Sequence, residues 1–269
     1  MSFKNPEINR LFINIRKNIY LSSLKLNKIF FKKIHNENER VIEIPYLLSR
    51  YNNQKNILEV GLSLADRTLV KSLIYLKKLK KLNLYGLDLI DIGKVKSRFK
   101  GLEIKKNFIF KQIDIRNFKL KKKFDFITLI STLEHVGFDE KNNDKNIKGV
   151  FLDRNYDDIK KNNDDFIAFK NLANTLKKSG SIIVTLPFGS RGLLVTKDSL
   201  GLTRYYREYN YLRVLKLIKI SRLKLLNIEF YQYKNKWKKI VNFSSFSNNS
   251  LSKHKPVKSI VCFELKKIK

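Results

Sequence analysis

The chain has 269 residues, of which 43% are hydrophobic, and a formal net charge of +33. This composition supports one large domain with a packed core and excludes wholesale disorder. The single cysteine, Cys262, excludes a disulfide framework and any metal site built from several cysteines. The sequence contains no long uncharged apolar run and no recognisable secretory signal, so we expect a cytoplasmic protein without a transmembrane helix.

The strong positive charge has two interpretations. The chain has 57 Lys and Arg against 24 Asp and Glu, and only 13 of the basic residues are Arg. Nucleic-acid-binding proteins favour Arg for bidentate contacts, whereas an excess of Lys and Asn spread along a chain is typical of an AT-rich genome. We therefore favour codon bias as the cause and keep an RNA-binding enzyme as the alternative.

Residues 1–40 form a basic segment in which Leu and Ile alternate with Lys and Asn. The spacing predicts a helical N-terminal extension before a main domain at 41–269. Such a helix can cover the domain as a cap, or residues 1–34 can contact an anionic membrane surface as a peripheral anchor. The irregular apolar stripe favours the cap. After this extension, Pro45 predicts the first turn of a short helix.

From residue 55 onward, short apolar runs alternate with helical patterns. Helices are expected at 66–80 and at 166–178, the second ending at Gly180. Alternating strands and helices predict βαβ units, and so an α/β fold with a Rossmann-like parallel sheet covered by helices on both faces. The predicted strands are at 56–61, 82–88, 108–114, 124–130, 181–186, 223–233 and 258–266.

Acidic residues stand at the ends of the first three predicted strands: Glu59, Asp88 and Asp114. The carboxyl ends of parallel strands meet at one edge of a sheet, where ligands of such folds bind. After the first strand, Gly61 and Ser63 supply the small residues that a close turn around a ligand needs. Asp88 lies one βαβ unit later, where it can accept both hydroxyls of a ribose.

This pattern resembles the class I S-adenosylmethionine-dependent methyltransferases, in which a glycine-rich turn follows an acid on strand one. The resemblance implies a seven-stranded sheet, S-adenosyl-L-methionine as cofactor, a cofactor site formed by Glu59, Gly61, Ser63 and Asp88, and contact of Asp114 with the adenine amino group.

Three downstream segments, at 124–137, 180–189 and 204–206, resemble methyltransferases encoded with surface-polysaccharide genes. With the segment around Glu39 and Arg40, the likeness covers about residues 39–265. It implies a saccharide or a related small acceptor that is methylated on an oxygen, with nitrogen as the less favoured alternative.

The sequence departs from the family motif where Ser63 and Ala65 replace its second and third glycines. Ala65 can adopt a positive φ only at a cost, and Leu62 and Leu64 are bulky for such a turn. The alternative hypothesis is therefore a degenerate methyltransferase fold that acts as a binding or scaffold module. A crevice filled by Leu62 or Leu64 would favour it.

His135 is the candidate general base, because imidazole titrates near neutral pH. A packing role for His135 is equally compatible with the sequence. Glu134 can orient it, and because Ser131 stands where some relatives carry a further Glu, no metal site is expected.

The acceptor site is expected in the polar stretch 138–165, between the fourth and fifth strands, and in the segment that follows the fifth strand. Its candidate residues are Arg154, Tyr156, Arg204 and Tyr206.

Overall fold

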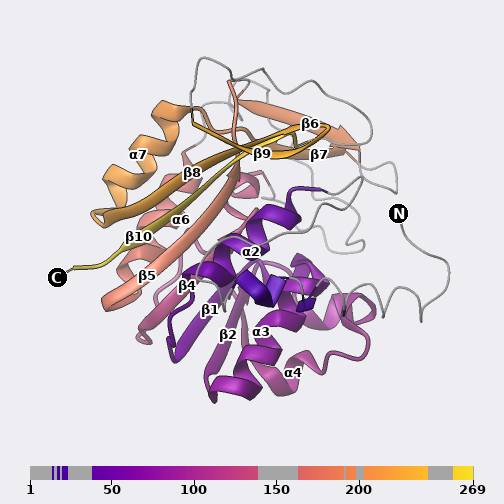
Figure 1. Ribbon diagram of the computed structural model, residues 1–269. Coiled ribbons are helices and arrows are strands. Elements are labelled where there is room, and N and C mark those ends of the chain that lie inside the picture. The colour runs from indigo at the N-terminus through magenta and orange to yellow at the C-terminus, as the bar shows by residue number, and fades with distance from the viewer. Residues whose placement is uncertain are drawn as a thin grey trace.

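The computed structural model describes residues 14, 17–18, 20–23, 38–138, 163–190, 192–197, 203–241 and 257–268. Its centre is an eight-stranded mixed sheet in the order β3-β2-β1-β4-β5-β10-β8-β9, flanked by helices (Figure 1). The expectation of a doubly covered α/β sheet is confirmed.

The first five strands in this order are mutually parallel, as the βαβ pattern predicts. Strand β1 lies between β2 and β4, so that Glu59 stands beside Gly86 on one side and Thr128 on the other. The strands are β1 (Asn56–Val60), β2 (Asn83–Asp88), β3 (Phe108–Gln112), β4 (Phe124–Ile130) and β5 (Leu176–Pro187).

The other part of the sheet is antiparallel. Strand β10 (Ser259–Lys266) runs against both β5 and β8 (Lys224–Lys234), and β9 (Lys236–Ile240) extends β8 as a hairpin at the sheet edge. The predicted count of seven strands is therefore wrong by one, because the lysine-rich run around Trp237 reads as polar although it forms an edge strand. Strands β6 (Leu193–Lys197) and β7 (Thr203–Arg207) pair separately.

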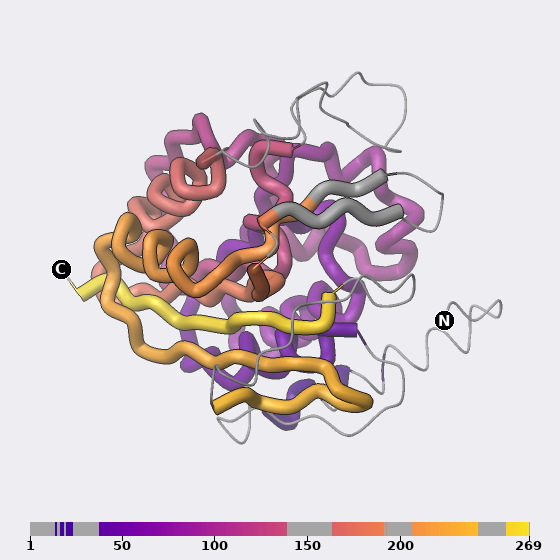
Figure 2. Tube along the Cα trace, turned by 90° about the horizontal axis from the view of Figure 1, so that it is seen from above, coloured from indigo at the N-terminus to yellow at the C-terminus, as the bar shows by residue number. Residues whose placement is uncertain are grey.

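Helices cover both faces of the sheet (Figures 1 and 2). Helices α2 (Arg40–Arg50) and α3 (Arg67–Lys80) contribute to one buried apolar cluster, and α6 (Asp164–Asn174) and α7 (Tyr211–Ser221) contribute to the other. The sheet supplies residues to both clusters, which is why its central strands are almost continuously apolar. The short elements are α4 (Ile104–Asn107), η1 (Leu62–Leu64), η2 (Ile92–Phe99) and η3 (Leu133–His135).

Two predicted helix boundaries are wrong. Pro45 lies inside α2 rather than in its first turn, because the helix already begins at Arg40. The helix expected at 166–178 ends at Asn174, and Leu176 already pairs with Phe124 as part of β5. The left-handed residue there is Ser179, with φ of 63°, and not Gly180. A register shift between β4 and β5 accommodates this irregular start.

Only a few residues of the predicted N-terminal extension belong to the described part of the chain. Asn14, Lys17, Asn18 and residues 20–23 are helical, and Tyr20 is buried in the same apolar cluster as α2 and α3. Both the extension at 1–40 and the domain at 41–269 stay predictions. Within the described ranges, every helix is too short or too polar to cross a bilayer.

Gly61 forms the turn that leaves β1, and both its conformation and its surroundings require glycine. Its φ is +86°, and a Cβ placed there would lie 2.6 Å from Thr132 Oγ1. Gly101 provides a matched comparison, since its φ is +83° and nothing lies within 4 Å of the same position.

We predict that Gly101→Ala lowers the free energy of unfolding by about 1–2 kcal/mol, the cost of a left-handed backbone alone. Gly61→Ala should cost about 1–3 kcal/mol more, because the new methyl group also displaces Thr132. Urea unfolding of both variants measures the difference. Equal losses would contradict the close approach of Thr132.

Candidate active site at the carboxyl edge of the sheet

The carboxyl ends of β1, β2 and β4 meet around Gly61. The Gly61 N–H donates to the Leu87 carbonyl oxygen at 2.8 Å, and Thr132 Oγ1 lies 3.0 Å from the Val60 carbonyl oxygen. These bonds join the three strand ends into one rim, where Glu59, Asp88 and Glu134 lie as the sequence predicts.

Asp88 ties the first turn to the second strand. Its two carboxylate oxygens accept hydrogen bonds from the N–H groups of Ser63 at 2.8 Å and Ile90 at 2.9 Å. Burial raises the pKa of Asp88, although these N–H donors oppose the shift. The Leu89 N–H and the Ser63 hydroxyl also face this carboxylate, so the chain itself supplies donors to most of its roughly four lone-pair sites.

The turn tolerates the two missing glycines. Ala65 has a φ of −57°, and Gly61 alone takes a positive φ between residues 61 and 65. Ser63 is buried, and its hydroxyl donates to the Ile90 carbonyl oxygen at 2.6 Å. The anticipated strain at Ala65 is therefore absent.

The two bulky leucines of the turn, Leu62 and Leu64, differ in their exposure to solvent. Leu62 is fully buried in the apolar cluster of α2 and α3, against Gly86, whose hypothetical Cβ would meet the Leu62 side chain at 2.2 Å. Leu64 is 46% exposed. Leu62 thus packs into the core, and Leu64 faces solvent.

Glu59 is buried between β1 and β4. Its carboxyl bonds to the Thr128 hydroxyl, and burial raises its pKa to about 8. The group therefore carries its proton at neutral pH and acts as a buried hydrogen-bonding group.

Asp114 lies just beyond β3 in a tight ion pair. The Arg116 guanidinium donates hydrogen bonds to its carboxylate at 2.6 to 3.0 Å, and the backbone N–H of Arg116 donates a further one at 2.8 Å. Burial alone would raise the pKa of Asp114, but the Arg116 contacts hold it below its ordinary value. Arg116 also bonds to Asp164 at the start of α6. Contact of Asp114 with adenine stays a prediction, and Arg116 would share that position.

Glu134 and His135 lie together on η3, directly after β4, with very different exposure. Glu134 is 2% exposed, and among the described residues its Oε2 atom has no hydrogen-bond partner. The His135 side chain is 46% exposed, and its Nε2 lies 3.9 Å from Glu134 Oε1. Burial raises the pKa of Glu134 to about 8. The better-shielded titratable group of this pair is thus the carboxyl, not the imidazole.

A buried ionic network around Asp165 contacts the backbone of η3 and of the residue that follows it. Asp165, on α6, is fully buried and bonds to Arg213 at 2.7 Å and to the Tyr209 hydroxyl at 2.9 Å. The same Tyr209 hydroxyl lies 3.4 Å from the Leu133 carbonyl oxygen, and Arg207 donates to Val136 at 3.4 Å. These contacts fix the backbone on both sides of Glu134.

Arg40 and Glu43 are functional candidates to which the sequence analysis gives no role. Glu43 is fully buried on α2 and forms an ion pair with Arg40. Its Oε1 accepts from the hydroxyls of Ser131 at 2.6 Å and Thr185 at 2.7 Å, at the ends of β4 and β5. An Arg and a Glu three residues apart were the available signal, but the predicted helix began only at Pro45, and only the fold shows that both side chains reach this edge.

Ser131 has a strained backbone, with a φ of +45°. Its hydroxyl bond to Glu43 and its N–H bond to the Thr185 carbonyl oxygen, at 3.2 Å, hold it there. Left-handed non-glycine residues tend to occur at functional sites, where the surrounding contacts determine the conformation.

The predicted acceptor residues are only partly described. Arg154 and Tyr156 lie outside the described residues. Arg204 is placed by its backbone in β7, opposite Thr196. Tyr206 is buried, and the centre of its ring lies 6.2 Å from that of His135. The structure therefore places the Tyr206 ring beside the His135 ring, and a common role of the two in acceptor binding stays a prediction.

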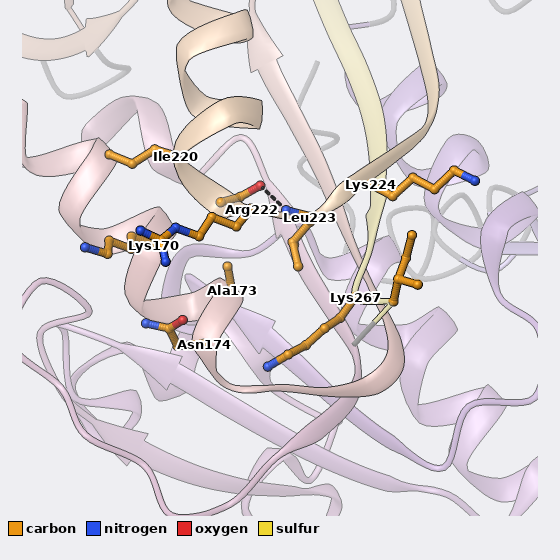
Figure 3. A pocket seen from close by; sticks show the side chains of 10 residues that line it. Lys170, Ala173, Asn174, Ile220, Arg222, Leu223, Lys224 and Lys267 are labelled. Carbon is orange, nitrogen blue, oxygen red and sulfur yellow. Dashed lines mark hydrogen bonds between the residues drawn. The ribbon is translucent and has the colours of Figure 1, made fainter.

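A hollow of about 610 Å³ lies at the opposite edge of the sheet, where α6 ends and β8 begins (Figure 3). Lys170, Arg222, Lys224 and Lys267 line it together with apolar and neutral polar residues, and none of the described residues that line it is acidic. It lies at the amino ends of the parallel strands, away from Gly61 and Asp88. The rule that ligands bind beyond the carboxyl ends separates it from the candidate active site.

Over the part of the chain that the structure describes, no group of three or more His, Cys, Asp or Glu side chains is arranged to hold a metal ion.

Comparisons with solved structures find methyltransferases, at low identity. An S-adenosylmethionine-dependent methyltransferase from Clostridium acetobutylicum is 14% identical, with a TM-score of 0.46, over 79% of this chain and 84% of that one. The 1,6-didemethyltoxoflavin-N1-methyltransferase from Burkholderia thailandensis, whose structure contains S-adenosylhomocysteine, is 10% identical, with a TM-score of 0.45. The match covers 80% of this chain and 71% of that one.

The N-methyltransferase NodS from Bradyrhizobium japonicum, in complex with S-adenosylhomocysteine, is 13% identical, with a TM-score of 0.40, over 93% of this chain and 100% of that one. No family model and no curated protein matches the sequence.

The raised pKa of Glu59 generates a prediction about stability and pH. The unfolded chain ionises this carboxyl near its ordinary value of 4.5, whereas the folded chain keeps the proton up to about pH 8. Stability is therefore lost as pH rises from about 4.5 to about 8. Glu59→Gln should remove this loss and add on the order of 4 kcal/mol at pH 8, with little gain at pH 4.5.

The melting temperature of Glu59→Gln measured across this pH range tests the prediction. Glu103→Gln is the control, because Glu103 lies on the surface. A gain for Glu59→Gln that is the same at every pH would contradict the protonated state.

Proposed function

We propose that the protein is an S-adenosylmethionine-dependent methyltransferase with its cofactor at the rim around Gly61 and Asp88. The observation that carries the proposal is the position of Asp88, whose partly buried carboxylate ends β2 beside the Gly61 turn. A ribose offers two adjacent hydroxyl donors that match such an acceptor.

The residues present fit this cofactor in part. Asp88 would accept the ribose hydroxyls, and the turn 61–65 would lie against the methionine portion. Asp114 is already held by Arg116, so adenine recognition there would involve both side chains. When bound, S-adenosylmethionine supplies a methyl group on a positively charged sulfur. The chain's own task is to align the acceptor and exclude water.

The acceptor proposed from the resemblance is a saccharide oxygen. A hydroxyl nucleophile needs a base at the reacting atom, and His135 is the exposed imidazole on η3. Glu134, at 3.9 Å from that ring, would orient it. Arg154, Tyr156, Arg204 and Tyr206 would then bind the acceptor.

A second candidate function is a binding module that has lost catalysis. It is favoured by one observation: both oxygens of Asp88 already accept hydrogen bonds from the chain's own backbone. The RNA-methyltransferase alternative has less support here, because four carboxyl groups interact with Arg40 at the candidate active site.

Calorimetric titration with S-adenosylhomocysteine tests the proposal. We expect micromolar binding by the wild type and at least a tenfold loss, about 1.4 kcal/mol, for Asp88→Asn. Asp125→Asn is the control, since Asp125 stands at the opposite end of β4 beside Asn56 and Lys177. Absence of binding by the folded wild type would refute the proposal, and equal loss in both variants would remove Asp88 from the site.

A further inference from the structure

The segment 209–228, which contains α7 and the first part of β8, combines positive charge with exposed apolar side chains. It has five basic residues and no acidic residue, and most of its other residues are Leu or Ile. Helix α7 and β8 lie at the side of the molecule in Figure 1, away from β1 and β2. The candidate active site uses none of these basic residues, which are Arg213, Lys216, Lys219, Arg222 and Lys224.

The outer side of α7 exposes leucines between lysines. Leu212 is 74% exposed and Leu215 is 39% exposed, whereas the other side of the helix is buried. Leu225, on β8, is also exposed and lies on the α7 side of the sheet, because its register partner Leu265 belongs to the apolar cluster beneath α7. The exposed residues of the helix recur every three or four positions, and we call them the α7 face: Leu212, Leu215, Lys216, Lys219 and Arg222.

The basic side chains around the end of α7 are exposed and available to a partner. Within the described part of the chain, the side chains of Lys219, Arg222 and Lys224 form no ion pair and no hydrogen bond. Helix α3 also has lysines in its last turn, but there Lys77 Nζ donates to the Asn107 carbonyl oxygen at 2.7 Å. The cations of α7 therefore differ from those of α3 in having no engagement with the described protein.

The end of α7 leads into the hollow at the amino ends of the parallel strands (Figure 3). Arg222, Lys170 from α6 and Lys267 after β10 line it, so that three separate elements bring cations to one cavity. Its volume of about 610 Å³ is in the range of small-molecule sites. Since none of the described lining residues is acidic, the hollow suits a phosphate group.

We infer that the α7 face and the hollow dock the protein on an anionic lipid surface. The exposed leucines enter the boundary of the acyl chains, the lysines meet the lipid phosphates, and one headgroup phosphate occupies the hollow. This surface is distinct from residues 1–34, for which the sequence analysis considers membrane contact. Docking leaves the candidate active site open, because β4, β5 and β10 separate β8 from β1.

Two other partners match this surface less well. A second copy of the chain would bring basic residues against basic residues, since 209–228 has no acid to offer in return. RNA would match the lysines but not the leucines, because single-stranded RNA binds through phosphate contacts and stacking on aromatic rings. The exposed aromatic residue of the segment, Tyr211, already contacts the Phe230 ring, with 6.4 Å between ring centres.

Co-sedimentation of the full chain with lipid vesicles at physiological ionic strength tests the inference. The vesicles contain phosphatidylcholine alone, or phosphatidylcholine and phosphatidylglycerol in equal parts. We expect binding to the mixed vesicles to be at least about tenfold tighter, and the double variant Lys219→Gln with Arg222→Gln to lose about tenfold. Leu212→Gln, which leaves the charge unchanged, should lose about fivefold.

Matched controls come from α3. Lys78 and Lys81 are exposed and occupy the positions at the end of α3 that Lys219 and Arg222 occupy at the end of α7, so Lys78→Gln with Lys81→Gln is the charge control. Leu79→Gln is the apolar control, because Leu79 is 55% exposed. Both controls should bind the mixed vesicles as the wild type does.

Four results would overturn the inference. They are equal binding of the wild type to both kinds of vesicle, an equal loss in the charge variant and its α3 control, unchanged binding by Leu212→Gln, and tight binding of polyuridylate without binding of vesicles. The last result would assign the surface to RNA. None of these measurements involves S-adenosylhomocysteine, so the proposed function stands or fails separately.

Discussion

The buried carboxylate of Glu43 holds the candidate active site together. It joins α2 to the ends of β4 and β5 through Ser131 and Thr185, and Arg40 balances its charge. Removing a partner from such a buried network leaves an uncompensated charge, which is among the most costly changes a fold can undergo. The left-handed turn at Ser131 and the position of Glu134 after it both depend on this contact.

Two networks support η3 from opposite sides. Glu43 holds Ser131, at the start of the connection from β4, and the Asp165 network holds the backbone around Leu133 and Val136. A functional group is positioned well only when its supporting contacts are themselves fixed. Glu134 meets this condition, because the elements on each side are buried and hydrogen-bonded.

The sequence predicted the parallel half of the fold, since apolar runs that end in Glu59, Asp88 and Asp114 have the periodicity of buried strands. It also predicted that these acids lie at the carboxyl edge of the sheet. It did not predict β9, because Trp237 among lysines gives no apolar run. It also did not assign Arg40 or Glu43 to the site. Helical spacing brings these two side chains together, but their contact with β4 and β5 depends on long-range packing that periodicity does not encode.

The central claim is that ligand chemistry takes place at the carboxyl edge around Gly61, Asp88 and Glu134. Amide hydrogen exchange with and without S-adenosylhomocysteine tests it most directly. The account predicts slower exchange at Ser63 and Ile90, whose N–H groups bond to Asp88, and no change around Lys170 and Arg222 at the opposite edge. Protection confined to that opposite edge, or none anywhere, would contradict it.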